Sequence, residues 1–120
     1  MAWKPNSPDQ IAAFERAFAG RAGLERKSMF GCPGVFSRGH MVAVLQADQW
    51  VLRLSETDGE ALVQIGGAPW RPMPNRPPAK DKIVLPAAVV ADPKKLGTWI
   101  QRALRFASQT PPKKKVQAGR

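Results

Sequence analysis

The apolar residues near the start of the chain recur at helical spacing. The repeat falls every three or four residues, at Ile11, Phe14, Ala17 and Phe18. Ser7 is a suitable N-cap, Pro8 suits the first helical position, and Gln10 completes a capping box. Gly20 is a suitable stop. The pattern predicts an amphipathic helix with one face on a core.

From Met29 onward the apolar period changes to two. The alternation predicts three short strands, at residues 34–37, 40–45 and 49–54. Arg38-Gly39 and Ala47-Asp48 provide the turns between them. In the third strand Trp50, Leu52 and Leu54 share one face. Short turns between consecutive strands predict an antiparallel meander.

The second half of the chain begins with a short helix, predicted at residues 56–65. Ser55 can cap this helix, and Gly66-Gly67 can end it. Residues 68–78 contain several prolines, which cannot donate to a sheet ladder. We expect an ordered loop pinned by Trp70 and Met73, with a disordered segment as the alternative. Residues 83–85 predict a brief fourth strand.

The last predicted helix begins at Asp92-Pro93 and runs to about Ser108. Its apolar residues fall within one arc at 100° per residue: Leu96, Trp99, Ile100, Ala103, Leu104, Phe106 and Ala107. Its cations lie on the opposite side: Lys94, Lys95, Arg102 and Arg105. Together the elements predict an α+β fold, an antiparallel β-meander with helices packed on one face and a long C-terminal helix.

A length of 120 residues and 13.1 kDa suits one domain. We assign residues 1–6 to an N-terminal extension, 7–110 to the domain and 111–120 to a flexible basic tail. No run approaches the roughly 20 apolar residues of a membrane span, and the N-terminus lacks the apolar centre of a signal peptide. We therefore expect a cytoplasmic protein. A single Cys and a single His argue against a disulfide within the chain, a multi-cysteine metal site and a paired-histidine site.

The formal charge of +10 and the pI near 10.7 favour contact with polyanions. Four cations lie in the acid-free last ten residues, so the rest of the chain carries +6. The basic candidates for contact with nucleic acid or a partner form a stripe on the last helix, extended by the tail: Lys94, Lys95, Arg102, Arg105, Lys113, Lys114 and Lys115. A second cluster lies in and after the proline-rich segment: Arg71, Arg76, Lys80 and Lys82. The alternative for the stripe is an ordinary solvated helix face.

Several short motifs, in order, resemble the TfoX N-terminal domain family, which is related to the amino-terminal half of the TfoX/Sxy competence regulator. The first motifs are Met29-Phe30-Gly31 with Gly34, Gly39-His40-Met41-Val42-Ala43, and Leu52-Arg53-Leu54. The later ones are Gly67-Ala68-Pro69, Pro72-Met73, Leu85-Pro86, and Leu96 with Trp99, Ala103, Leu104 and Phe106. The resemblance covers roughly residues 7 to 110. It implies the fold, a bacterial source and a link to transcriptional control, and it implies no catalytic residue.

The chain departs from the family pattern in three ways. Cys32 and Pro33 stand where the family has glycine and a variable residue, and Pro78 stands where methionine often follows Arg-Pro. The separate C-terminal domain of the regulator is expected to be missing.

Two features of the sequence could indicate chemistry instead of binding alone: a lone cysteine and a cluster of acidic residues. Cys32, with His40 as its one possible histidine partner, could be a reactive thiol in the Met29–Gly34 loop of a small enzyme or ligand-binding protein. The acidic cluster of Glu56, Asp58 and Glu60 could serve acid–base chemistry, or could simply complement the dipole at a helix start.

The sequence therefore predicts a non-enzymatic interaction module without cofactor or metal. We expect its partner to be a protein or nucleic acid and not a membrane. Trp70, Pro72 and Met73 could form an exposed apolar patch that contacts a partner protein. The alternative is that these residues are buried in the domain's own core and anchor the loop. A sheet edge at residues 83–85 leaves open a structural homodimer.

Overall fold

The computed structural model describes residues 6–21, 23–29, 32–71, 75, 77 and 81–110. The helices are α1 (Pro8–Phe18), α2 (Glu56–Gln64), α3 (Ala87–Val90) and α4 (Pro93–Gln109). The strands are β1 (Glu25–Met29), β2 (Cys32–Ser37), β3 (His40–Gln46), β4 (Gln49–Arg53), β5 (Ala68–Pro69) and β6 (Lys82–Val84). The predicted α+β class is confirmed.

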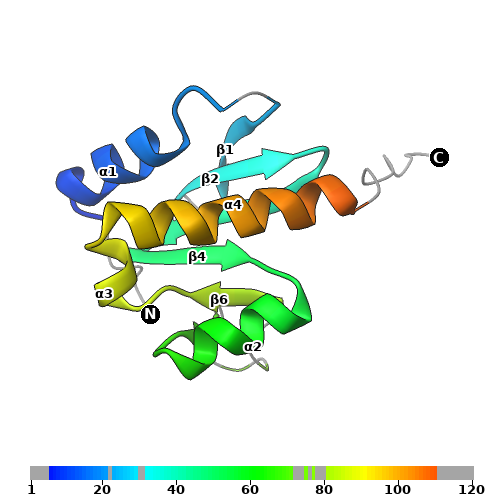
Figure 1. The fold of residues 1–120 in the computed structure, drawn as a ribbon. Helices are drawn as coiled ribbons and strands as arrows, with labels where there is room; N and C mark the ends of the chain where they lie inside the picture. The colour runs from blue at the N-terminus through cyan, green and yellow to red at the C-terminus, as the bar shows by residue number, and fades with distance from the viewer. Residues whose placement is uncertain are drawn as a thin grey trace.

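The strands form one antiparallel sheet in the order β1-β2-β3-β4-β6-β5. The central meander β2-β3-β4 is the predicted one. β6 follows α2 and β5 in the chain but inserts beside β4, which leaves β5 at the edge. The long helix α4 lies across the sheet, with α1 beside it (Figure 1).

A bulge in β3 adapts the sheet to its helices. Val35 pairs with Ala43 and Phe36 pairs with Met41, so Val42 is the extra residue. Both Val42 and Ala43 consequently belong to the core beneath the helices. The main core joins this face of the sheet to all four helices, through residues such as Phe14, Leu62, Val89 and Ile100. Helices packed on one face are thus confirmed.

A smaller apolar cluster lies apart from the main core. Cys32, Met41, Val44, Val51 and Trp70 are all buried in it. The predicted face assignment of β4 holds, because Trp50 and Leu52 belong to the main core while Val51 belongs to this second cluster.

Two turns tie distant parts of the chain together. Ala47 and Asp48 both have positive φ, a costly conformation for residues other than glycine. Asp48 is held there by Asn6 and Ser7: its N–H donates to Asn6 Oδ1, and its Oδ1 accepts from the Ser7 N–H, both at 2.7 Å. In the turn between β2 and β3, Arg38 Nη2 donates to the carbonyl oxygens of Ala107 and Ser108 in the last turn of α4 and of Thr110, the C-cap residue.

Three elements differ from the sequence-based expectation. β1 and α3 were not predicted, and the proline-rich segment begins with β5 instead of a loop. Trp70 is buried at 3% exposure and its Nε1 donates to Gln46 Oε1 at 2.7 Å, as expected for a loop anchor and not for an exposed patch. Pro72 and Met73, and most of residues 72–80, lie outside the described residues.

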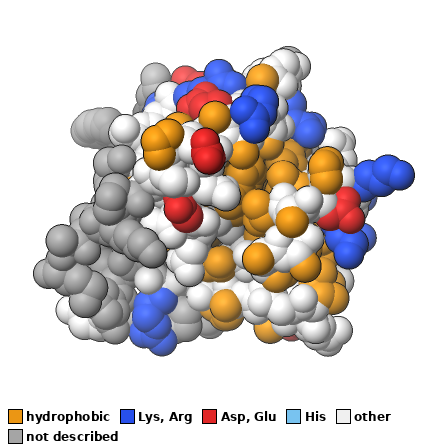
Figure 2. Space-filling model, turned by 90° about the vertical axis from the view of Figure 1, so that its left-hand side faces the viewer, with side chains coloured by type: hydrophobic (Ala, Val, Ile, Leu, Met, Phe, Trp, Pro, Cys, Tyr) orange, Lys and Arg blue, Asp and Glu red, His pale blue; other side chains and the backbone are white. Residues whose placement is uncertain are grey.

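Hydrophobic side chains gather on the side of the molecule where α1 begins and α3 lies (Figure 2). They surround a hollow of about 490 Å³ whose lining includes Ala13, Leu85, Val90 and Leu96. Within the described part of the chain, none of the helices is long and apolar enough to cross a membrane.

Candidate functional site: the outer face of α4

The two faces of α4 carry different chemistry. Asp92 caps the helix, accepting hydrogen bonds from the N–H groups of Lys94 and Lys95. Trp99, Ile100, Ala103 and Ala107 are buried. Lys94, Lys95 and Arg105 are exposed on the outside. Because the apolar arc is held against the sheet, the cations must face solvent together.

The outer face contains a hollow of about 880 Å³, here called the α4 hollow. Its lining comes from α4 and from one residue of α2: Pro93, Lys94, Gly97, Thr98, Gln101, Arg102, Arg105 and Asp58. Three cations and one carboxylate give this lining a net positive charge. Lys95 is exposed but does not line the hollow.

Arg102 is the cation whose position is fixed. Its Nη1 lies 3.1 Å from Asp58 Oδ1, and its guanidinium carbon lies 4.7 Å from the centre of the Trp99 ring. The ion pair and the cation–π contact hold the guanidinium on the wall of the hollow. Asp58 thereby neutralises part of the charge, and Lys94 and Arg105 remain the cations best placed to meet an anion.

Sequence reasoning missed the polar residues between these cations. Thr98 and Gln101 lie on the same helical face as Lys94 and Arg105, at offsets of four, seven and eleven residues from Lys94. Gln101 Oε1 accepts a hydrogen bond from Arg21 Nη1 at 3.4 Å, which brings a further cation beside the hollow. The helical positions of Thr98 and Gln101 could have been predicted from the sequence, but the contact between Arg21 and Gln101 could not.

Of the second predicted basic cluster, the structure describes Arg71 and Lys82, which lie on neighbouring segments because the Trp70 N–H donates to the Lys82 carbonyl oxygen. Arg71 is exposed just after β5, whereas Lys82 is half-buried and its Nζ lies 3.1 Å from Asp81 Oδ1. Arg76 and Lys80 lie outside the described residues, as do Lys113, Lys114 and Lys115 of the tail.

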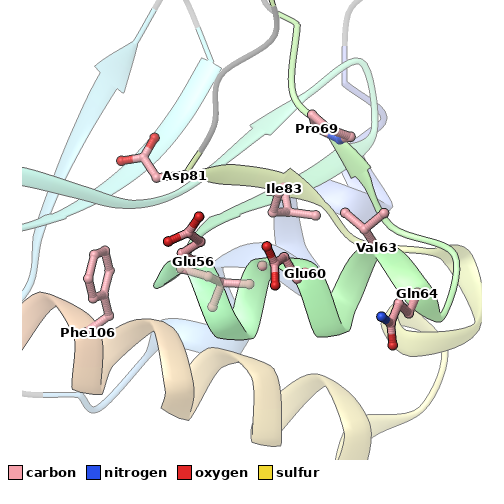
Figure 3. Close-up of a pocket in the computed structure, with 10 residues that line it drawn as sticks. Glu56, Glu60, Val63, Gln64, Pro69, Asp81, Ile83 and Phe106 are labelled. Carbon is pink, nitrogen blue, oxygen red and sulfur yellow. The ribbon is translucent and has the colours of Figure 1, made fainter.

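A second hollow, the α2 groove, lies on the other side of α2 and has a volume of about 690 Å³. Leu54, Ile83, Val63, Pro69 and Phe106 give it an apolar lining. Glu56, Glu60 and Asp81 are its charged lining residues (Figure 3). Figure 3 shows the carboxylates of Glu56 and Glu60 on the side of α2 that faces Ile83. The predicted acidic cluster is therefore divided, with Asp58 turned to α4 and the two glutamates turned to this groove.

Asp81 is the structural carboxylate of the α2 groove. Its Oδ2 accepts a hydrogen bond from Arg53 Nε at 2.9 Å, and the Arg53 guanidinium lies 4.6 Å from the centre of the Phe106 ring. Burial alone would raise the pKa of Asp81, but hydrogen bonds and charges from Arg53 and Lys82 outweigh it and lower that pKa below its ordinary value. The role of the Asp81 carboxylate is therefore structural: it is ionised and holds Arg53 and Lys82 in place.

Cys32 and His40 lie near opposite ends of β2, because His40 pairs with Ser37, the last residue of that strand. Cys32 is the first residue of β2, 7% exposed, and packs in the second apolar cluster. Burial raises the pKa of its thiol, although a hydrogen bond with Asn6 acts in the opposite direction. The thiol is therefore protonated at neutral pH and a poor nucleophile. Neither residue is among the described lining of the α4 hollow or the α2 groove.

The described residues contain no cluster of potential metal ligands. Among these residues, no three His, Cys, Asp or Glu side chains are grouped so that they could hold a metal ion. The α4 hollow instead combines exposed cations with hydrogen-bonding side chains.

Comparison with known protein families gives a match over most of the chain. The pattern of the TfoX N-terminal domain family matches residues 16–107, which extend from α1 to the last turns of α4. No curated protein matches the chain. The match covers most of the chain and includes the whole sheet, so the chain belongs to the TfoX N-terminal domain family.

Proposed function

We propose that this protein is a non-enzymatic regulatory module that contacts nucleic acid through the outer face of α4. The observation that carries the proposal is the α4 hollow, where Lys94, Arg102 and Arg105 surround polar side chains on one exposed helix. Family membership supports a regulatory module in a coarse sense. Cations on a solvent-facing helix would neutralise phosphates and give affinity that depends on salt and little on sequence.

The test is binding of the full chain to a short DNA duplex, to single-stranded RNA of the same length and to polyglutamate, across a salt series. With about three phosphates neutralised, the slope of log K against log salt should be about −2.7, a loss of about 40-fold between about 50 and 200 mM. Absence of duplex and RNA binding at low salt would contradict the proposal. Preference for polyglutamate would assign the surface to an acidic protein.

A protein partner is the second candidate function, and the α2 groove favours it. Val63 lines this groove and is 40% exposed, one of two large hydrophobic side chains in the described residues that are this open to solvent. An apolar groove bordered by Glu56 and Glu60 suits a segment carrying a Lys or Arg beside an apolar side chain. Charge reversal at these two glutamates should weaken the binding of such a partner and leave the binding of nucleic acid unchanged.

A further inference from the structure

Gly97 lies in the interior of α4, where glycine is costly. Relative to alanine, a glycine inside a helix lowers the folding equilibrium constant about fourfold, because it loses more backbone freedom on folding. Such a residue calls for a physical reason, and glycines have two common ones: a positive φ, or a neighbour too close for a Cβ atom.

All but one of the other glycines that the structure describes have one of these reasons; the exception is Gly59 of α2, whose added Cβ would meet Ile83 only at an ordinary van der Waals distance. Gly20, Gly23, Gly39 and Gly66 have positive φ. A Cβ atom on Gly34 would approach Lys27 O at 3.1 Å, one on Gly67 would approach Leu62 O at 2.9 Å, and one on Gly59 would contact Ile83 at 3.5 Å. Gly97 differs from all of them: its φ is not positive, and an added Cβ would meet nothing within 4 Å.

The open space at Gly97 lies inside the α4 hollow. Lys94 precedes it by three residues, and Gln101 and Arg105 follow at four and eight, so the four positions share one helical face. At 1.5 Å per residue, Lys94 and Arg105 are about 16 Å apart along the helix axis. Without a Cβ at position 97, a ligand lying between these cations can approach the helix backbone more closely than any other residue would permit.

We propose that Gly97 is the point at which the sugar–phosphate backbone of a bound nucleic acid lies against α4. This inference rests on the proposed function and names its contact point. Lys94 and Arg105 neutralise phosphates on either side of Gly97. Gln101 Oε1 accepts a hydrogen bond from Arg21. The amide NH₂ group of Gln101 is then oriented to donate a hydrogen bond to the sugar–phosphate backbone of the nucleic acid.

The shape of the ligand decides between a nucleic acid and an acidic peptide. A Glu or Asp side chain reaches a Lys or Arg head group on its own flexible stem, so it has no need of a gap at the helix surface. A sugar–phosphate backbone is a continuous chain, and its bulk must pass along the helix if its charges are to meet both Lys94 and Arg105. The gap at Gly97 fits the second case.

The test replaces Gly97 with residues of increasing size. Gly97→Ala should raise the midpoint of thermal unfolding by about 2–6 °C, because alanine has the higher helix propensity and its Cβ atom meets no neighbour. The same variant should lose about three- to tenfold in affinity for the DNA duplex, and Gly97→Leu more than tenfold. A gain in stability joined to a loss of binding separates a contact role from a folding defect.

The control places the same groups elsewhere on α4. Gln109 is exposed at the last position of the helix and does not line the α4 hollow. Gln109→Ala and Gln109→Leu should keep duplex affinity within about twofold. Circular dichroism of each variant confirms that the helix content is retained.

The outcomes separate the two proposals. If the wild-type chain binds duplex and both Gly97 variants bind it as tightly, the contact at Gly97 is overturned and the proposed function stands. If the wild-type chain binds no duplex or RNA at low salt, both are overturned. If polyglutamate binds better and the Gly97 variants weaken that binding, the occupant is an acidic peptide and the backbone contact is overturned.

Discussion

The α4 hollow and the α2 groove lie on two sides of the same short helix and have opposite character. The α4 hollow is polar, and three of its four charged lining residues are cations. The α2 groove is apolar, and its charged lining residues are all acids. α2 takes part in both, because Asp58 faces α4 while Glu56 and Glu60 face the groove.

The difference teaches that a net charge says little about any one surface. A chain of formal charge +10 still presents a groove with Glu56, Glu60 and Asp81. The Asp58–Arg102 ion pair joins α2 to α4 in the lining of the α4 hollow. A polyanion should therefore recognise the α4 hollow and avoid the groove, and the variants below measure that separation.

The largest expected effect comes from reversing the charges of Lys94 and Arg105 in the α4 hollow. Lys94→Glu with Arg105→Glu should weaken duplex binding by about 30- to 100-fold and reduce the salt slope by about two, because two phosphate contacts are lost. Fluorescence anisotropy across a salt series measures both quantities.

The matched control for this variant is Arg26→Glu with Lys27→Glu, two exposed cations of β1. Each double variant lowers the formal charge from +10 to +6. Equal losses of affinity in the two variants would mean that binding follows total charge, and the α4 hollow would then have no special role.

The next effect tests whether the α2 groove contains one structural and two free carboxylates. Asp81→Asn should lower the free energy of unfolding by about 1–3 kcal/mol, since Arg53 is only 16% exposed and would lose its charged partner. Glu60→Gln, in the same groove, should change it by less than about 0.5 kcal/mol. Urea unfolding compares the two, and similar values would remove the distinction.

The pH dependence of stability offers a smaller and independent measure. The pKa of Asp81 is lowered in the folded protein, so its contribution is present above the ordinary value of 3.8 and is lost as pH falls through the folded pKa. Between about pH 4 and pH 2 the wild type should lose more stability than Asp81→Asn. We expect a difference below about 1 kcal/mol, because the side chain is 39% exposed and water screens it. Parallel pH curves would contradict this assignment.

The smallest effect concerns the Asp58–Arg102 ion pair of the α4 hollow. Asp58→Asn removes the one carboxylate of the α4 hollow, so duplex affinity should rise about two- to threefold. Stability should fall by less than about 1 kcal/mol, because both partners are partly exposed. A loss of affinity would show instead that the pair positions Arg102 for binding.

Much of the fold follows from local pattern, and its omissions have clear causes. The helices α1 and α4 and the meander were predictable because their apolar periods differ, and α2 was predictable from the capping Ser55 and the terminating Gly66-Gly67. β1 was not, since Glu25, Arg26, Lys27 and Ser28 are all exposed and show no alternation. β5 and α3 span two and four residues, too few for a period to be recognised.

The candidate site was predictable only in outline. Helical spacing alone placed Lys94, Lys95, Arg102 and Arg105 on the outside of α4. The cluster containing Arg71 and Lys82 was less informative, because nearness along the chain does not reveal that Lys82 forms an ion pair. Lys82 is engaged by Asp81, and its neighbours Arg76 and Lys80 are outside the described residues.

The sequence by itself determined the family, the α+β class and the basic outer face of α4, because each depends on the order and periodicity of nearby residues. Only the tertiary structure decided how that charge is arranged. It pairs Arg102 with Asp58 across 44 positions of the chain. It also leaves Gly97 open in the α4 hollow. Ion pairs and empty space depend on which elements meet, and a period along one helix carries no information about its neighbours.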